Sequence, residues 1–447
     1  MSPWSAAGFK GQRLVERVVK PLTDRLGLDR GITREVTALG AATIGSQIIA
    51  AAAVIVLTRL YDPEDFGIYA ATLSITSIIL VTGCLRYEQA IPIAESRTQA
   101  AQLIVLSVCL GTMVLALAGG LLLLLEPWIA PTLGIESLTP YAGLILLAGT
   151  GGVIGLVLHG WAVRARAFTD LAQARLSGAV GLVVAQISLG LLGAGAAGLL
   201  LGDALGRGGG TARLARRLWR DEGAEIRRVR VASLPAVARR YRRFPILSGP
   251  SAILNVVNLQ LPMLTVVAMF GSATAGVFLL AGRVVSLPNS IAMGALAPVF
   301  VAESARVRTD HEALQRLFDR TVRRLLMVGV VPATAIVLAG PTLFAIVFGQ
   351  EWAEAGVFAA LLAPMYLVQL LTAPVSGILS VLERQDLHLA KEIGNLLLMI
   401  LVIAVASTSQ WTAVPTIAAL SAVGLLSAIA YFVAMRHAVS RVGRVAR

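Results

Sequence analysis

The sequence predicts an all-α integral membrane protein of about twelve transmembrane helices, arranged in two pseudo-symmetric six-helix bundles around a central cavity. Hydrophobic residues make up 57% of the 447 positions and charged residues only 14%, whereas a soluble chain carries roughly a quarter charged residues. Apolar stretches long enough to cross a bilayer recur along the whole chain. A transmembrane β-barrel would instead show alternating segments of about ten residues, and the sequence has none.

The apolar stretches define the predicted spans in chain order. The weakest boundary separates the fifth span from the sixth at residues 192–195, and the sixth is short unless it continues past Gly206. The spans are 36–57, 66–85, 100–125, 141–163, 176–193, 194–206, 246–270, 273–301, 325–349, 354–381, 387–406 and 412–435.

The distribution of charge predicts the orientation. With the N-terminus in the cytoplasm, all of the 38 Lys and Arg residues except Arg59 and Arg283 fall in cytoplasmic segments. Such a bias follows the positive-inside rule, because basic segments resist translocation and are attracted to anionic headgroups. Acids occupy the outer connections instead: Asp62, Glu64, Asp65, Glu126, Glu136, Glu351 and Glu354. We therefore expect a multi-pass protein of the bacterial inner membrane with both termini in the cytoplasm. We attribute the net charge of +13 to this membrane topology and expect no nucleic-acid interface.

The same pattern divides the chain into segments. Residues 1–35 are basic and amphipathic, which is typical of a helix lying along the cytoplasmic interface. The predicted bundles are 36–206 and 246–435, joined by a basic cytoplasmic linker at 207–245 and followed by a basic tail at 436–447. The linker is read as a topogenic segment in preference to a dedicated partner site.

The two halves resemble one another in sequence. Residues 66–69 match 275–278 at an offset of 276 − 67 = 209, residues 91–96 match 299–304, and residues 169–171 match 385–387, all in the same order. Because six spans is an even number, the halves enter the membrane in the same orientation. Duplicated bundles of this kind favour a transporter with a path between them.

Three motifs carry a resemblance to a known family. Residues 57–69 read LTRLYDPEDFGIY, residues 85–92 read LRYEQAIP, and residues 348–352 read FGQEW, followed by Ala355 and Gly356. They resemble the first outer loop, the segment after the second helix and the loop before the tenth helix of oligosaccharide flippases of the polysaccharide transporter family. That family belongs to the multidrug/oligosaccharidyl-lipid/polysaccharide (MOP) exporter superfamily. Taken singly, Asp62 and Pro63 can simply cap and start a helix.

The resemblance implies a function. Members of the family move undecaprenyl-diphosphate-linked oligosaccharide from the inner to the outer leaflet for O-antigen, capsule or exopolysaccharide assembly. This implies a lipid-linked saccharide and membrane lipid as partners, together with a polysaccharide polymerase and assembly proteins. The alternatives are a multidrug or peptidoglycan-precursor exporter of the same superfamily and a membrane polysaccharide polymerase or ligase. The enzyme alternative lacks support, because the longest outer loop, near residues 126–140, holds no acid–base pair or nucleophile set.

Candidate cavity residues follow from the charge of such a cargo. An arginine near the bilayer centre costs about 2.5–3.5 kcal/mol, so Arg283 should face an aqueous cavity, where its forked donors suit phosphate; an ion pair with Asp203 and snorkelling are the alternatives. Arg59 and Arg86 are further candidates at helix ends. Gln47, Asn255 and Asn258, with Ser46 and Gln260, are polar groups within apolar spans that either line the cavity or bond between packed helices.

The sequence gives less information about how transport is coupled to an energy source. No Walker-type loop is present, so we expect neither direct ATP use nor a cofactor, and no metal site is predicted. Proton or cation coupling would need a titratable group in the path. Asp203, Glu88 and His159 are the candidates, and His159 could instead bond a backbone carbonyl near a helix end.

Overall fold

The fold was analysed in a computed structural model that describes residues 30–132, 139–307, 310–382 and 384–441. The chain divides into two compact units, of which residues 34–276 form one and residues 277–441 lie in the other. We call them the first and the second unit. The predicted interfacial segment 1–35 and the tail 436–447 fall largely outside the described residues.

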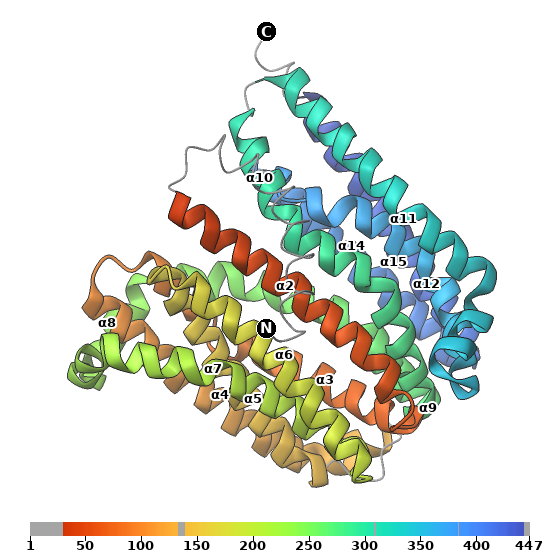
Figure 1. Cartoon of the computed structure of the whole chain (residues 1–447), viewed down its shortest axis with the longest axis horizontal. Helices are drawn as coiled ribbons and strands as arrows, with labels where there is room; N and C mark the ends of the chain where they lie inside the picture. Colours follow the sequence, from red (N-terminus) through yellow and green to blue (C-terminus); the bar gives the residue numbers. More distant parts are fainter. Residues whose placement is uncertain (1–29, 133–138, 308–309, 383, 442–447) are drawn as a thin grey trace, which may run out of the picture. The chain divides into compact units, whose positions relative to one another are not determined.

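The first unit is built entirely from helices in its described part (Figure 1). Helices α6 and α7 pack side by side, and α5 packs against α7 and α4. Its elements are α2 (Arg30–Leu57), α3 (Pro63–Gly83), the 3₁₀ helix η1 (Tyr87–Ile93), α4 (Arg97–Thr132), α5 (Thr139–Arg164), α6 (Phe168–Leu191), α7 (Gly195–Arg228), η2 (Val231–Ser233), α8 (Leu234–Arg240), a π-helical turn at Phe244–Ser248 and the first part of α9 (Gly249–Ala295).

The second unit begins within α9 and is helical as well. Helix α12 packs against both α11 and α15, and α14 packs against α15. Its remaining elements are α10 (Ala297–Arg306), α11 (His311–Phe348), η4 (Gln350–Trp352), α12 (Ala353–Thr372), η5 (Ala373–Val375), α13 (Ile378–Val381), α14 (Gln385–Thr408) and α15 (Ala413–Arg441).

Eleven of the twelve predicted spans fall largely within long, apolar helical segments of the structure. Within the described ranges, ten helical segments are long and apolar enough to cross a membrane. One of them covers residues 244–295 and breaks at Gly271, whose φ of 82° only glycine adopts readily. Helix α7, which holds the sixth predicted span, is not among the ten. The protein is therefore an all-helical, multi-pass membrane protein, as the sequence predicts.

Three predicted boundaries differ from the observed ones. Helix α6 begins at Phe168 instead of residue 176, and α11 begins at His311 instead of residue 325. Helix α7 continues to Arg228, so the start of the predicted linker is helical. The reason is common to all three: these amphipathic extensions carry charged residues on one face, and an apolar-run criterion ends a helix where its charges begin.

Two glycines let α3 and α9 cross backbone to backbone within the first unit. A Cβ atom placed on Gly67 would lie 1.7 Å from the carbonyl oxygen of Ser272, and one placed on Gly276 would lie 1.8 Å from that of Pro63. The contact is reciprocal in the internal repeat, because 276 − 67 and 272 − 63 both equal 209. The side-chain hydroxyl of Ser74 on α3 also donates to Oε1 of Gln260 on α9 over 3.0 Å. This crossing explains why residues 246–276, predicted in the second bundle, belong to the first unit.

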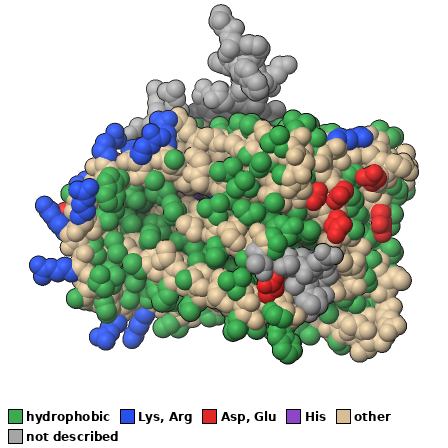
Figure 2. Space-filling model, turned by 90° about the horizontal axis from the view of Figure 1, so that it is seen from below, with side chains coloured by type: hydrophobic (Ala, Val, Ile, Leu, Met, Phe, Trp, Pro, Cys, Tyr) green, Lys and Arg blue, Asp and Glu red, His purple; other side chains and the backbone are tan. Residues whose placement is uncertain are grey.

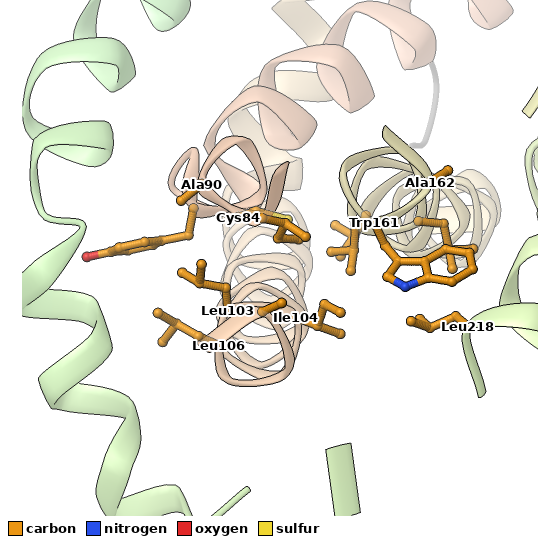
Figure 3. Close-up of a cluster of buried hydrophobic side chains, with 14 of the residues drawn as sticks. Cys84, Ala90, Leu103, Ile104, Leu106, Trp161, Ala162 and Leu218 are labelled. Atoms are coloured by element: carbon orange, nitrogen blue, oxygen red, sulfur yellow. The ribbon is translucent and has the colours of Figure 1, made fainter. Parts of the chain in front are cut away.

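A hydrophobic cluster packs the opposite end of α3 against its neighbours (Figure 3). Trp161 of α5 is 1% exposed and lies among side chains from α4, α7 and the η1 segment. Labelled members are Cys84, Ala90, Leu103, Ile104, Leu106, Trp161, Ala162 and Leu218. The cluster fixes the segment 85–92 at this end of the unit.

Candidate functional site

The motif at residues 57–69 forms the turn between α2 and α3. Asp62 caps α3 by accepting a hydrogen bond from the backbone N–H of Asp65 over 3.0 Å, and Pro63 occupies the first turn of the helix. The Tyr61 hydroxyl donates to the carbonyl oxygen of Gln186 on α6 over 2.7 Å. Burial, with the nearby Asp65 carboxylate, raises the pKa of Tyr61 to about 12, so the hydroxyl remains a donor. The motif thus ties the α2–α3 turn to α6.

The motif at residues 85–92 is buried and strained. Leu85 and Arg86 have φ angles of 47° and 65°, a left-handed conformation that costs energy in residues other than glycine. Glu88 is 6% exposed, and its Oε1 lies 3.7 Å from Nη1 of Arg86. Nε of Arg86 and Oε2 of Glu88 are buried without a hydrogen-bond partner among the described residues. This geometry makes the half-buried Arg86 and the buried Glu88 a pair that is only partly satisfied.

The Glu88 carboxyl predicts a stability change with pH. Burial raises the pKa of Glu88 more than its own backbone N–H and Arg86 lower it. A raised native pKa means that the folded protein binds this proton more tightly than the unfolded chain, so stability falls as pH rises through the native pKa. We expect Glu88→Gln to raise the melting temperature in detergent at neutral pH and to lose that advantage in mild acid. Glu312→Gln, at an exposed position, is the control, and an equal response of both variants would contradict the assignment.

The motif at residues 348–356 connects α11 to α12. Gly349 has a φ of 116°, Trp352 is 1% exposed, and a Cβ atom on Gly356 would lie 2.3 Å from the carbonyl of Gly340. The glycines allow the two helices to approach at backbone distance, and Trp352 is buried at the turn. All three motifs therefore have structural roles at helix connections.

The structure separates two of the predicted cavity arginines. Arg59 is exposed in the turn before α3, and Arg86 lies just after the other end of that helix. A helix of the length of α3 spans about 30 Å at 1.5 Å per residue. Arg59 and Arg86 therefore cannot hold the same diphosphate at the same time.

The other predicted cavity residues lie on α2 and α9. Gln47 on α2 and Asn255 on α9 are half-buried, and Asn258 is 7% exposed. Arg283, beyond the Gly271 break, is half-buried, and a Cβ atom on its neighbour Gly282 would lie 4.0 Å from the hydroxyl of Tyr366. Their role in binding stays a prediction, whereas Gln260 makes the interhelical bond to Ser74 that was its alternative.

Asp203, the proposed alternative partner of Arg283, forms an ion pair within α7. Its Oδ2 lies 2.7 Å from Nε of Arg207, one helical turn away, and Asp203 is 7% exposed. A Cβ atom on Gly151 of α5 would lie 3.4 Å from Cβ of Arg207. The pair therefore sits where α5 and α7 pack closely.

A second arginine, Arg175, lies within α6 at an exposed position beside α2. Nη1 of Arg175 donates to Oγ1 of Thr43 on α2 over 2.6 Å, and His159 of α5 lies within electrostatic range of its guanidinium. The exposed apolar residues Val180 and Val184 occupy the opposite face of α6 at 100° per residue. Arg175 lies about 10 Å along the helix from Phe168. Groups from α2 and α5 thus lie beside the exposed Arg175, inside a helix that is long and apolar enough to cross a membrane.

We call two separate groups, Arg175 with Thr43 and His159 and Asp203 with Arg207, together the polar set of the first unit. It carries two arginines against one acid, so its net charge is positive before His159 is counted. Sequence reasoning predicted His159 and Asp203 but placed both arginines in cytoplasmic segments, because each lies next to a basic connection. The signal that could have found Arg175 is its position opposite the apolar stripe of the same helix.

Charged side chains are segregated over the molecule. Figure 2 shows most of the Lys and Arg side chains of the visible face towards the left and most of the Asp and Glu side chains towards the right, with one basic group among the acidic ones. Near α7 the cations are partly neutralised, since Arg213 and Arg217 both pair with Asp170 of α6. This segregation agrees with the charge bias seen along the sequence.

Comparison with known proteins decides the family. Residues 56–357, more than half of the chain, match a family described as polysaccharide biosynthesis protein. The chain belongs to this family. It is also 27% identical over 315 residues to the succinoglycan biosynthesis transport protein ExoT of Rhizobium meliloti (strain 1021), covering 69% of this chain and 60% of that protein. The match therefore spans less than two thirds of that relative.

Solved structures show the fold of this polysaccharide biosynthesis protein. An inward-facing multidrug resistance MATE family transporter of the MOP superfamily superposes with a TM-score of 0.68 at 14% identity, covering 92% of this chain and 96% of that one. The lipid II flippase MurJ in an inward closed conformation gives a TM-score of 0.67 at 9% identity, covering 90% and 89%. The predicted MOP fold is confirmed, and these relatives are transporters and not enzymes, as expected for this chain.

Proposed function

We propose that this MOP-type flippase moves an undecaprenyl-diphosphate-linked oligosaccharide from the inner to the outer leaflet of the bacterial inner membrane. The observation that carries the proposal is the net positive charge of the polar set on the packed helices of the first unit, in a chain of the polysaccharide biosynthesis protein family. Arginine guanidinium groups bind phosphate oxygens through charge-assisted, forked hydrogen bonds. A polar head with a diphosphate needs such a compensating environment, because leaving it unpaired in hydrocarbon is costly.

The named relatives support the same substrate class. One is a succinoglycan biosynthesis transport protein and another a lipid II flippase. A lipid-linked saccharide for exopolysaccharide, capsule or O-antigen assembly fits both, with polymerase and assembly proteins as partners that receive the product. A cationic polar set disfavours cationic drugs, which argues against multidrug export.

The route and orientation complete the proposal. The lipid tail stays in the bilayer while the saccharide head crosses through a polar path by alternating access of the two bundles. Both termini lie in the cytoplasm, as the charge bias predicts. Arg283, Arg59, Arg86, Gln47, Asn255 and Asn258 are the further groups proposed to contact the head during its passage.

The experiment that tests this function follows the cargo across a membrane. Purified protein is reconstituted in liposomes with an undecaprenyl-diphosphate-linked saccharide that carries a fluorescent label on the sugar. An impermeant reductant bleaches only the outer-leaflet label in protein-free liposomes. We expect the protein to move labelled lipid from the inner to the outer leaflet, so that the reductant bleaches the inner-leaflet pool as well. Bleaching that remains at the protein-free level, with folded protein present, would refute the function.

Arg175 offers a direct prediction within that assay. We expect Arg175→Ala to lower the rate of saccharide movement about tenfold to a hundredfold, because a hydrogen bond to a charged group contributes about 1.5–3 kcal/mol. Arg175→Lys should be intermediate, since an ammonium keeps the charge without the fork. Arg216→Ala, at an exposed position of α7, is the matched control. Equal rates for Arg175→Ala and Arg216→Ala would remove Arg175 from the path.

A further inference from the structure

Helix α14 carries a polar stripe that the mechanism so far does not use. His388, Glu392 and Asn395 follow one another at helical spacings of four and three, so they share a face. Glu392 is 3% exposed and Asn395 is 7% exposed. The opposite face is apolar and exposed, with Leu389, Ile393, Leu397, Ile400 and Leu401, as expected where a helix meets lipid. The stripe therefore points towards the protein.

Helix α15 completes a cluster of titratable groups within the second unit. Oη of Tyr431 lies 3.2 Å from Nδ1 of His388, and Tyr431 is 7% exposed. Nζ of Lys391 lies 2.7 Å from Oε1 of Glu392 and 5.8 Å from the centroid of the Tyr431 ring. Tyr431 thus contacts the exposed His388, and Lys391 lies between the Tyr431 ring and the buried Glu392.

A purely structural role does not account for this arrangement. A buried ion pair stabilises a fold little or not at all relative to packed apolar residues, because both ions lose their hydration. A carboxylate inside a membrane span adds a further cost unless it is paired. Four titratable side chains on two neighbouring helices therefore indicate a group that changes its charge during function.

We propose that Glu392 is the carboxylate that takes up and releases the proton coupled to transport, with Lys391 as its counter-charge in the deprotonated state. One proton from the aqueous phase adds to the carboxylate and gives the neutral acid, which ends the ion pair while the Lys391 ammonium keeps its charge. His388 and Tyr431 provide hydrogen-bonding groups between the exposed end and the buried end. This inference rests on the proposed function, because the coupling concerns the same transport.

The surroundings define which groups compete for that proton. Helix α13 contributes no titratable side chain, and Arg384 is held by Asp386 at the start of α14. From α15 the facing group is Tyr431, while Arg436 and His437 lie further along that helix. His388 and Lys391 on α14 are the nearest basic groups.

Two readouts on full-length protein test the proposal. The first is the saccharide assay at about pH 5.5 and about pH 8, with and without a proton gradient across the liposomes. We expect Glu392→Gln to lose the response to the gradient and to lower the driven rate at least about tenfold. The double variant Lys391→Met/Glu392→Gln removes both charges, so it avoids an unpaired ammonium and should fold normally, yet it should also lack the response.

The second readout needs no cargo. The melting temperature of the purified protein in detergent is measured over the same pH range, and the difference between wild type and Glu392→Gln reports the proton bound at this site. Glu312→Gln on α11 is the control, because its carboxylate is 79% exposed. Wild-type gradient response and wild-type pH dependence in the double variant would overturn the proposal. If no protein moves the saccharide but Glu392→Gln still flattens the melting profile, the proposed function fails and the proton site stands.

Discussion

Gly67→Ala is expected to destabilise the first unit strongly and to abolish transport. The new Cβ atom would lie 1.7 Å from the carbonyl oxygen and 2.4 Å from the carbonyl carbon of Ser272. Both atoms belong to backbone, so no side chain can move aside and α3 and α9 must separate. Overpacking of this kind costs about 1–3 kcal/mol or more. The measurement is the melting temperature in detergent together with the rate of saccharide movement.

The repeat supplies a second variant at the same crossing. Gly276→Ala should have a similar effect, because its Cβ atom would lie 1.8 Å from the carbonyl oxygen of Pro63. Since one separation of the helices relieves both clashes, the double variant should cost less than the two single losses together. Gly40→Ala and Gly394→Ala are controls, because nothing lies within 4 Å of their Cβ positions. A Gly67→Ala protein as stable and active as the Gly40→Ala protein would show that the crossing is not required.

Trp161→Ala is expected to have a comparably large effect on stability. The indole is 1% exposed and lies near Leu218 in the cluster that packs α4, α5, α7 and η1 together (Figure 3). Removing a buried tryptophan leaves a cavity and costs on the order of 3 kcal/mol. The stability lost is mainly that of van der Waals packing contacts. The hydrophobic effect contributes less, because lipid, and not only water, can solvate the exposed side chains of a membrane protein.

The control for this change is the same substitution at an exposed site. Trp128 on α4 is 77% exposed, so Trp128→Ala should shift the melting temperature far less. Because the cluster holds the strained segment 85–92, Trp161→Ala should also lower transport at equal protein abundance. Equal melting temperatures for the two variants would contradict the role assigned to the cluster.

The fold was largely predictable because its signals are local. Length and apolarity of a stretch decide whether a helix can span the bilayer, and the bilayer leaves helices as the only spanning option for such stretches. The ends of α6, α7 and α11 were misjudged, since an amphipathic extension keeps its hydrogen bonds while its composition turns polar. Gly271, by contrast, falls between two predicted spans and breaks α9 where the sequence indicated.

The candidate site was predictable only in part. Asp203, Glu88 and His159 were found as charges within or beside apolar stretches. Arg175 and Lys391 were taken for cytoplasmic charges, although each lies on a helix with an apolar face turned the other way. The stripe of His388, Glu392 and Asn395 was not predicted. Its partner Tyr431 comes from another helix, and no spacing within one helix predicts a contact with the next.

The sequence by itself determined that the chain crosses a membrane many times, which connections carry positive charge, and that two halves repeat. These features follow from composition, because the residues of each stretch decide whether that stretch is solvated by lipid or by water. Only the tertiary structure showed that Gly67 and Gly276, which are equivalent positions of the repeat, lie where α3 and α9 cross. It also showed that Asp203 pairs with Arg207 and which polar groups meet across helices. Such contacts depend on how helix faces rotate and pack, and close packing is set by the shapes of both partners together.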